Sequence, residues 1–242
     1  MIDIVYPDED YNSWRYAQDA RKVIQDRIDE NPLLIVGGSG LYLRALIDGF
    51  FVLPNNEECK KVRQTFKGIP TSELYEKLKE VDPDTAKRLH PNDRQRITRA
   101  LEVFLVTNRP MSYWQNTGRL RAGFNPIYIG LICERSELKE RIAKRVNRMI
   151  ELGFVEEVKH LLEMGYSKEL NSLRTIGYKE IIEYLEGKIT FEHAIYLIKK
   201  HTIEYAKRQI TWFKRLPNVN WINIYENPIE KIQLLLRRFL LV

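Results

Sequence analysis

Residues 33–43 read Leu-Leu-Ile-Val-Gly-Gly-Ser-Gly-Leu-Tyr-Leu, an apolar run that continues through a glycine-rich turn into a second apolar stretch. This pattern predicts a buried strand over 33–36, then a turn, then a helix that ends near Gly49. Backbone N–H groups converge where a helix begins, and the helix dipole favours negative charge there. The junction therefore predicts either a tight structural turn or a contact with an anionic or nucleotide substrate, and spacing alone leaves both open.

Glycines in this turn lack a side chain and so permit a phosphate or a base to approach the backbone closely. They are Gly37, Gly38 and Gly40. The turn matches neither GxxxxGK[ST] nor GxSxG, because Leu41 stands where the last glycine of GxSxG is required. The motif suggests a site without defining its chemistry.

Strand-like and helix-like patterns alternate on both sides of this junction. Further strands are predicted over 2–5, 127–132 and 219–225, and helices over 14–29, 136–152, 154–164 and 191–215 and after Pro228. Buried strands that alternate with helices indicate an α/β core with a parallel sheet. The stretch 55–123 is strongly charged and predicts only short helices, so we expect an all-helical insertion between two core segments, 1–54 and 124–242.

The composition excludes several classes of protein. A hydrophobic content of 44% over 242 residues can fill a core, which argues against a wholly disordered chain. The net charge of +6 and the pI near 9.1 are compatible with a nucleic-acid partner without establishing one. The two cysteines lack CxxC spacing, and no signal pattern or membrane-length apolar run occurs. We therefore expect a cytoplasmic protein with no membrane partner.

Two helical segments carry basic residues on one face. A helix is predicted over 93–107, and its apolar seam consists of Ile97, Leu101, Phe104 and Leu105. Gln95, Arg96 and Arg99 lie opposite this seam, where arginine can hold a phosphate and glutamine can contact a base edge. Arg145 lies between Arg141 and Arg148 at helical spacing, and such arginines can neutralise a diphosphate. Solvated faces and surface ion pairs are the alternatives for both segments.

A third basic segment, 207–215, interleaves lysine and arginine with Trp212 and Phe213. This pattern suits contact with an RNA backbone together with stacking, and it also suits aromatic residues that simply belong to a core. The four histidines show no metal-ligand spacing, so no metal site is expected from them.

Several short motifs occur in a characteristic order along nearly the whole chain. They are Ile2-Asp3-Ile4-Val5, Pro7-Asp8-Glu9, Val36-Gly37-Gly38-Ser39-Gly40-Leu41-Tyr42, Val81-Asp82-Pro83, His90-Pro91-Asn92-Asp93, Arg99-Ala100-Leu101-Glu102-Val103, Gly153-Phe154, Thr175-Ile176-Gly177-Tyr178 and Ala206-Lys207-Arg208-Gln209-Ile210-Thr211-Trp212. Each motif is weak alone, but the ordered set resembles the tRNA dimethylallyltransferases, or tRNA isopentenyltransferases, of the bacterial type.

The resemblance implies transfer of a dimethylallyl group from dimethylallyl diphosphate to N6 of adenosine 37, beside the tRNA anticodon, with Mg²⁺. It implies a P-loop-NTPase-like core, a helical insertion that grips the anticodon stem-loop, and a monomer. By position, Ser39 stands where the family usually has threonine and would contact the target nucleotide. Arg145 matches the arginine that helps hold the diphosphate.

The same resemblance implies that tRNA contacts come from four segments. These contacts are Lys61, then Gln95, Arg96, Ile97, Thr98 and Arg99, then Arg174, Thr175, Ile176, Gly177, Tyr178 and Lys179, and finally Lys207, Arg208, Gln209, Ile210, Thr211, Trp212, Phe213 and Lys214.

The sequence departs from the family pattern at its beginning. The family starts with a strand, a GxxxxGK[ST] loop and an Asp-Ser segment whose aspartate is the proposed base, and the 242 residues contain none of these. We therefore expect an N-terminally incomplete member, with little transferase activity as an isolated chain. The alternatives are an adenylate isopentenyltransferase acting on free nucleotides and a non-catalytic tRNA-binding remnant.

Overall fold

The computed structural model describes residues 1–27, 33–49, 56–117 and 123–240. The chain divides into two compact units. The α/β unit comprises Met1–Leu43 and Asn125–Val242, and the helical unit comprises Arg44–Phe124. The predicted insertion, 55–123, falls inside the helical unit, although 50–55 and 118–122 lie outside the described residues.

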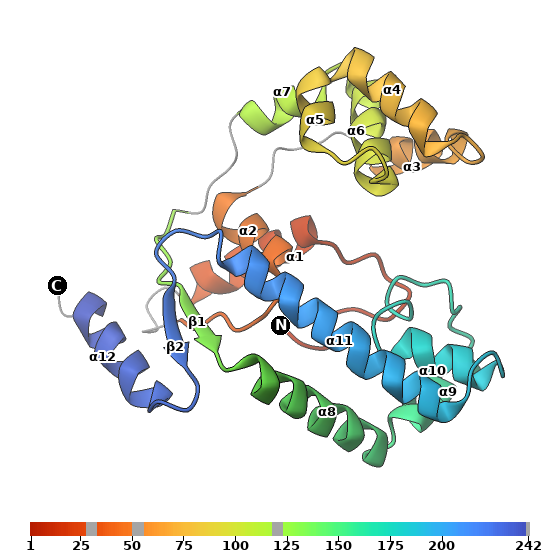
Figure 1. The fold of residues 1–242 in the computed structure, drawn as a ribbon. Helices are drawn as coiled ribbons and strands as arrows, with labels where there is room; N and C mark the ends of the chain where they lie inside the picture. Colours follow the sequence, from red (N-terminus) through yellow and green to blue (C-terminus); the bar gives the residue numbers. More distant parts are fainter. Residues whose placement is uncertain (28–32, 50–55, 118–122, 241–242) are drawn as a thin grey trace. The chain divides into compact units, whose positions relative to one another are not determined.

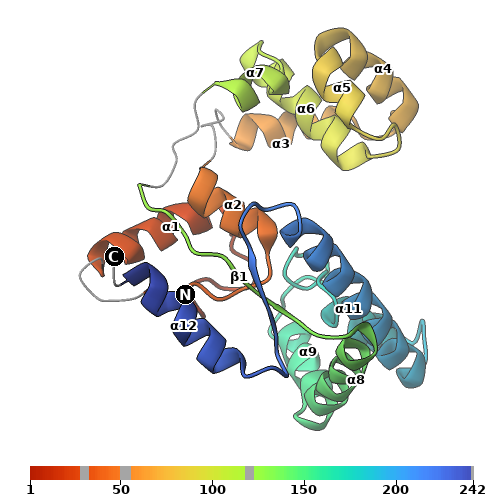
Figure 2. The same cartoon turned by 60° about the vertical axis from the view of Figure 1, so that its left-hand side comes forward.

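The α/β unit is mostly helical (Figures 1 and 2). Its helices are α1 (Ser13–Asp26), the start of α2 (Gly40–Asp48), α8 (Arg135–Glu151), α9 (Phe154–Glu163), α10 (Tyr178–Leu185), α11 (Phe191–Phe213) and α12 (Pro228–Leu240). Asn12 caps α1 by accepting the N–H groups of Trp14 and Arg15, which confirms the predicted start of this helix. The predicted end of that helix at 28–29 lies outside the described residues.

The core of this unit lies where α8, α9 and α10 pack with α11. Both views show α8 running beside α11 (Figures 1 and 2). Ile142 and Val146 of α8, Val158 of α9, Ile181 of α10 and Ile198 of α11 are buried together. Burial of these aliphatic side chains stabilises the packing of α8, α9 and α10 with α11.

The sheet is smaller than the sequence predicts. β1 (Ile129–Ile132) pairs in parallel with β2 (Asn220–Asn223), with Ile129 opposite Asn220 and Ile132 opposite Asn223. The predicted α/β class with a parallel sheet is confirmed by this pair. The predicted strands at 2–5 and 33–36 are wrong, because neither segment is in strand conformation.

Leu33–Val36 is also exposed instead of buried, with Leu34 at 68% and Val36 at 93%. A strand is stabilised by backbone hydrogen bonds to a neighbouring strand. Among the described residues, 33–36 has no such neighbour in the sheet, which consists of β1 and β2 alone. The segment 33–36 is therefore irregular because it lacks a neighbouring strand, although its residues are hydrophobic.

Five helices form the described residues of the helical unit that follow α2. They are α3 (Asn56–Thr65), α4 (Thr71–Val81), α5 (Pro83–Arg88), α6 (Arg94–Thr107) and α7 (Met111–Asn116). Its core includes Leu74 and Leu78 of α4 together with Ile97, Leu101 and Val103 of α6. The predicted seam of α6 was partly wrong, since Leu105 is 53% exposed.

Asp82, of the Val81-Asp82-Pro83 motif, joins three helices of this unit. It is 1% exposed and accepts the N–H groups of Thr85 at the start of α5 and Ser112 in α7, each at 3.0 Å. Burial by itself would raise the pKa of Asp82, but hydrogen bonds from Thr85 and Ser112 outweigh it and lower the pKa below 3.8. The ionised carboxylate therefore stabilises the folded unit.

Replacement of Asp82 by alanine is expected to lower the free energy of unfolding by about 1–3 kcal/mol at neutral pH, because two buried N–H groups lose their acceptor. The folded pKa lies below the unfolded value of 3.8, so this stabilisation is present above that pH and is lost as the pH falls through the folded pKa. Urea unfolding at several pH values measures it. Asp84→Ala, at an exposed neighbouring position, is the control, and an equal loss in both variants would contradict the account.

Candidate functional site

The glycine turn of 37–40 lies against the C-terminal part of α11. Gln209 Nε2 donates a hydrogen bond to the carbonyl oxygen of Gly38 at 3.0 Å. A methyl group placed on Gly40 would come well inside 3.0 Å of the Trp212 ring, so the indole occupies the space that the glycine leaves free. Two segments that the sequence singled out separately therefore form one site.

Ser39 lies at the centre of this contact and is partly exposed. Its backbone carbonyl accepts the N–H of Leu43 at 3.1 Å in the first turn of α2. Its hydroxyl makes no hydrogen bond to any residue in the described ranges. The hydroxyl is thus available for a substrate while the backbone around it is held in place.

Three tyrosines pack where α1 meets the start of α2. The rings of Tyr16 and Tyr42 lie 4.9 Å apart, and the Tyr42 hydroxyl donates to the Tyr11 carbonyl at 3.4 Å. The pKa of Tyr11 is raised to about 12, mainly because the phenol is partly buried and also because Asp19 lies beside it. The Tyr11 hydroxyl donates a hydrogen bond to Asp19. These tyrosines stay protonated at neutral pH and brace the helix that begins at Gly40. Sequence reasoning assigned no role to Tyr16.

The residues of α11 that neighbour Gln209 and Trp212 in the sequence include several exposed cations. Lys207, Arg208, Thr211 and Lys214 are exposed, whereas Gln209, Ile210, Trp212 and Phe213 are partly buried. The Trp212 and Phe213 rings meet edge to face at 4.9 Å. The cations of this segment therefore face solvent and its two aromatic rings pack against each other, while contact with RNA stays a prediction.

The segment 174–179 is tied to α11 by a buried carboxylate. Glu180 is 2% exposed, accepts the N–H of Gly177 at 2.7 Å and pairs with His201 Nδ1 of α11 at 2.7 Å. Gly177 has φ of +102°, and an added methyl group would press on the Phe154 ring. Sequence reasoning missed Glu180, although an acid three residues after the cap position signals a capping box.

The predicted RNA-contacting residues of this segment have different environments. Arg174, Thr175 and Lys179 are exposed, with Arg174 3.9 Å from Glu169 and Lys179 3.7 Å from Glu183. Ile176 is partly buried. Gly177 is buried, and Tyr178 packs edge to face on Phe154 and donates to Glu157 at 2.5 Å. Burial, reinforced by Glu157, raises the pKa of Tyr178 to about 12. Gly177 and Tyr178 therefore shape the loop rather than present a surface.

Arg145 is an exposed residue of α8, between the buried Ile142 and Val146 that pack this helix into the core. It has no ion-pair partner within the described ranges, whereas Arg148 pairs with Glu151 at 3.3 Å. Ser39 and Arg145 make no hydrogen bond to each other. Arg145 is thus free to bind an anion.

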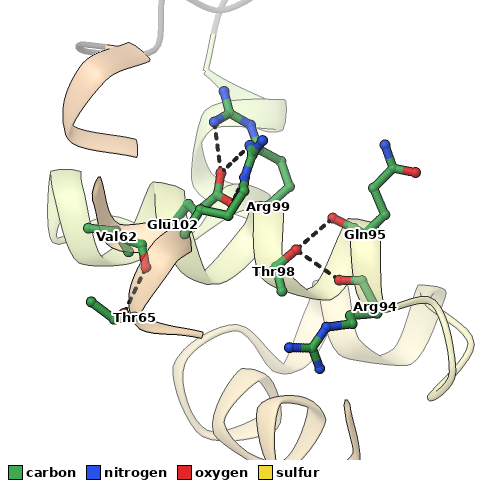
Figure 3. A network of polar contacts seen from close by, with 8 residues as sticks. Val62, Thr65, Arg94, Gln95, Thr98, Arg99 and Glu102 are labelled. Carbon is green, nitrogen blue, oxygen red and sulfur yellow. Dashed lines mark hydrogen bonds and ion pairs between the residues drawn. The ribbon is translucent and has the colours of Figure 1, made fainter. Parts of the chain in front are cut away.

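The helical unit contains the remaining predicted contacts. Lys61, Gln95 and Arg96 are exposed, and Thr98 and Arg99 are partly exposed. The prediction that Ile97 contacts tRNA is corrected here, because its side chain is fully buried in the core of the unit. The Thr98 hydroxyl donates to the carbonyls of Arg94 and Gln95 (Figure 3).

Sequence reasoning also missed the acid that organises this surface. Glu102 is fully buried and accepts from Arg63 Nε at 2.6 Å, from Arg63 Nη2 at 2.9 Å and from Arg99 Nη1 at 3.2 Å. Figure 3 shows the Glu102 carboxylate beside Arg99. This hydrogen bonding by Glu102 raises the pKa of Arg63. The buried acid therefore joins α3 to α6.

Comparison with known proteins agrees with this arrangement. A family model described as IPP transferase matches residues 1–216. The chain is 43% identical over 242 residues to a curated tRNA dimethylallyltransferase from Thermotoga maritima, covering 99% of this chain and 79% of that protein. It is 44% identical over 226 residues to the Thermotoga neapolitana protein of the same name, covering 93% and 73%.

The chain belongs to the IPP transferase family.

Two solved structures are also similar to this chain. A tRNA isopentenylpyrophosphate transferase from Staphylococcus epidermidis matches with a TM-score of 0.65 and 32% identity, covering 98% of this chain and 80% of that chain. A eukaryotic dimethylallyltransferase acting on tRNA matches with a TM-score of 0.78 at 24% identity, covering 95% of this chain and 62% of that chain, and shows that the fold is shared.

Within the described ranges of this IPP transferase, no group of three or more His, Cys, Asp or Glu residues could hold a metal ion. In the same ranges, no helix is long and apolar enough to cross a membrane.

Proposed function

We propose that this chain acts as a tRNA dimethylallyltransferase, which transfers the dimethylallyl group of dimethylallyl diphosphate to N6 of adenosine 37 in the tRNA anticodon stem-loop. The observation that carries the proposal is the contact of Gln209 and Trp212 with the glycine turn, in a chain that belongs to the IPP transferase family. The contact supports Ser39 from the same helix that exposes Lys207, Arg208 and Lys214.

The proposed reaction breaks the bond between the allylic carbon and the diphosphate oxygen, and forms a bond from that carbon to N6. The leaving diphosphate takes the electron pair, and the exocyclic amine loses one proton to solvent or to the released diphosphate. The adenine must leave the base stack for N6 to reach the donor. Ser39 is proposed to orient the target nucleotide, and Arg145 to stabilise the negative charge that develops on the diphosphate.

The tRNA is proposed to be held by the exposed cations of α11, by the exposed residues of 174–179, and by the surface of the helical unit. Buried Gly177 and Ile97 shape these surfaces from within. Free nucleotides as acceptors are not favoured, because the curated relatives are tRNA dimethylallyltransferases.

Further proposals accompany the activity. We propose a P-loop-NTPase-like arrangement for the α/β unit, a monomeric state and a cytoplasmic location. Mg²⁺ is proposed as the cofactor, although the described residues include no group of three or more His, Cys, Asp or Glu side chains that could hold a metal ion. The 242 residues contain no GxxxxGK[ST] motif to cradle the diphosphate, so low turnover is expected from this chain alone.

The function is tested by incubating the chain with labelled dimethylallyl diphosphate and an anticodon stem-loop RNA, with the Thermotoga maritima relative as a positive control. We expect stem-loop binding that weakens steeply with salt, and label on N6 at a rate well below that of the relative. Absence of stem-loop binding would contradict the proposal. Label on free AMP but not on RNA would replace it with prenyl transfer to a nucleotide.

Two substitutions of Ser39 are expected to distinguish the contribution of its hydroxyl to RNA binding from that of its backbone. Ser39→Ala removes the hydroxyl and should weaken stem-loop binding by about tenfold, equivalent to one hydrogen bond of about 1.4 kcal/mol. Ser39→Thr keeps the hydroxyl and is the matched control, expected to stay near wild type. Titration of fluorescent stem-loop RNA measures both. Equal weakening by threonine and alanine would show that the site responds to shape and not to the hydroxyl.

A further inference from the structure

One edge of the two-stranded sheet is open. Asn220 N donates a hydrogen bond to the Tyr128 carbonyl at 2.9 Å, which places the backbone groups of alternate β1 residues against β2. The N–H and carbonyl groups of the intervening residues, Ile129 and Leu131, therefore point away from β2. Within the described ranges no strand pairs with this edge, because the sheet consists of β1 and β2 alone.

An open edge is unusual for a parallel sheet. Parallel strands occur almost only where both of their faces are covered. Leu131 is nevertheless 58% exposed, and the adjoining Ile132 is exposed as well. Unpaired backbone groups beside exposed aliphatic side chains form a template for another strand. The edge of β1 thus has the chemistry of a strand-binding site.

Residues 33–36 form a second strand-like segment of the same α/β unit, and all four of their apolar side chains are exposed. The segment is followed by the turn of 37–40 and α2, just as β1 is followed closely by α8. Strands that each lead into a helix run in parallel in an α/β sheet. Because a strand has two edges, one added strand can pair with β1 on one edge and with 33–36 on the other.

The exposed groups define what can occupy this surface. Unpaired backbone groups are matched by another extended backbone, and a row of aliphatic side chains is matched by apolar side chains. Neither 33–36 nor 129–132 contains a charged residue, so these segments offer no cation to an anion or a nucleic acid. The occupant is therefore an apolar strand of polypeptide. The Thermotoga relatives contain further polypeptide outside the matched region, since the match covers 73% and 79% of them.

We propose that the open edge of β1 and residues 33–36 bind an apolar β-strand of a second polypeptide, which corresponds to the part of an IPP transferase outside the matched region. The added strand pairs in parallel with β1 through Ile129 and Leu131 and orders 33–36 as a further strand of the sheet. Because the carboxyl ends of parallel strands share one edge of a sheet, the second polypeptide then continues beside the glycine turn of 37–40. The complex contains one copy of this chain, and the proposal depends on its family and not on the RNA acceptor.

The test mixes the 242-residue chain with the part of the Thermotoga maritima relative that lies outside the match, produced as a separate polypeptide. Sedimentation measures the complex, and backbone amide hydrogen exchange followed by NMR measures the edge of β1. We expect a complex of one chain with one polypeptide, in which exchange of the Ile129 and Leu131 N–H groups slows by at least about tenfold. Slowed exchange at these two positions identifies pairing at the open edge.

Two substitutions of exposed residues should interfere with this surface without removing core contacts. Leu131→Lys places a charge beside the open edge, and Val36→Asp places one in the second segment. Each should weaken the complex by at least about tenfold, because the charge would be buried against apolar side chains. Leu152→Asp is the matched control, since Leu152 is 69% exposed in the same unit but lies between α8 and α9. It should leave the affinity unchanged, and urea unfolding should show that the three free variants are as stable as the wild type.

Three results would overturn the proposal. The first is absence of a complex with the wild type, or equal weakening by all three substitutions. The second is a complex in which the Ile129 and Leu131 amides exchange at unchanged rates, because the contact would then lie elsewhere. The third is self-association of the chain that Leu131→Lys abolishes, because a second copy would then occupy the edge. Neither measurement involves RNA, so these results are independent of the proposed transferase function.

Discussion

Gly40→Ala is expected to displace the Trp212 indole from the glycine turn and to weaken both folding and RNA binding. The added methyl group would overlap rigid ring atoms that cannot move without disturbing α11. Overpacking of this kind costs about 1–3 kcal/mol. Because Ser39 and the start of α2 depend on this contact, stem-loop binding should fall more than it does with Ser39→Ala.

The glycines of the same turn provide a graded series of controls. A methyl group on Gly38 would meet the end of the flexible Gln209 side chain, so Gly38→Ala should cost little stability but break the Gln209 hydrogen bond. A methyl group on Gly37 meets nothing within 4 Å. In urea unfolding and stem-loop titration, the loss of stability and of affinity should be largest for Gly40→Ala, smaller for Gly38→Ala and smallest for Gly37→Ala. A Gly40→Ala variant that behaves like Gly37→Ala would show that Trp212 does not support the turn.

The second large effect concerns the buried acid of the helical unit. Arg63→Met would leave the fully buried Glu102 with Arg99 as its remaining ionic partner. Breaking one side of a buried ion pair typically costs about 3–5 kcal/mol. The Arg63 side chain is 59% exposed, so solvent screening reduces the expected loss to about 2–3 kcal/mol.

Removal of the acid should be less damaging than removal of the arginine. In Glu102→Met both arginines can turn toward water, since their side chains are 59% and 33% exposed. The double variant Arg63→Met/Glu102→Met should therefore be more stable than Arg63→Met alone. Urea unfolding of the three variants completes a double-mutant cycle. If Glu102→Met were the least stable of the three, the account of a buried charge held by an exposed partner would be wrong.

Local helix signals made much of the fold predictable from the sequence. Asn12 caps α1 as its side-chain chemistry predicts, and the charged insertion folds as helices around the apolar face of α6. These features depend on residues within a turn or two of each other. The strands at 2–5 and 33–36 failed because a strand depends on a partner elsewhere in the chain, which local hydrophobicity cannot reveal.

The candidate site was predictable only in its separate parts. The glycine turn and the 207–215 segment each carried a visible pattern, but nothing in either sequence indicated that Trp212 fills the space above Gly40. Glu102 and Glu180 were missed because an acid on a helix ordinarily faces solvent. Glu102 does follow Leu101 and precede Val103, and an acid within an apolar run is the signal that could have found it.

The most direct test of the account is the affinity of the chain for two anticodon stem-loops that differ only at position 37, one with adenosine and one with an abasic site. If the target adenine leaves the stack and meets Ser39, the adenosine RNA must bind more tightly, and Ser39→Ala must reduce that difference. Equal affinity for the two RNAs would contradict the account, because the glycine turn would then make no contact with the target nucleotide.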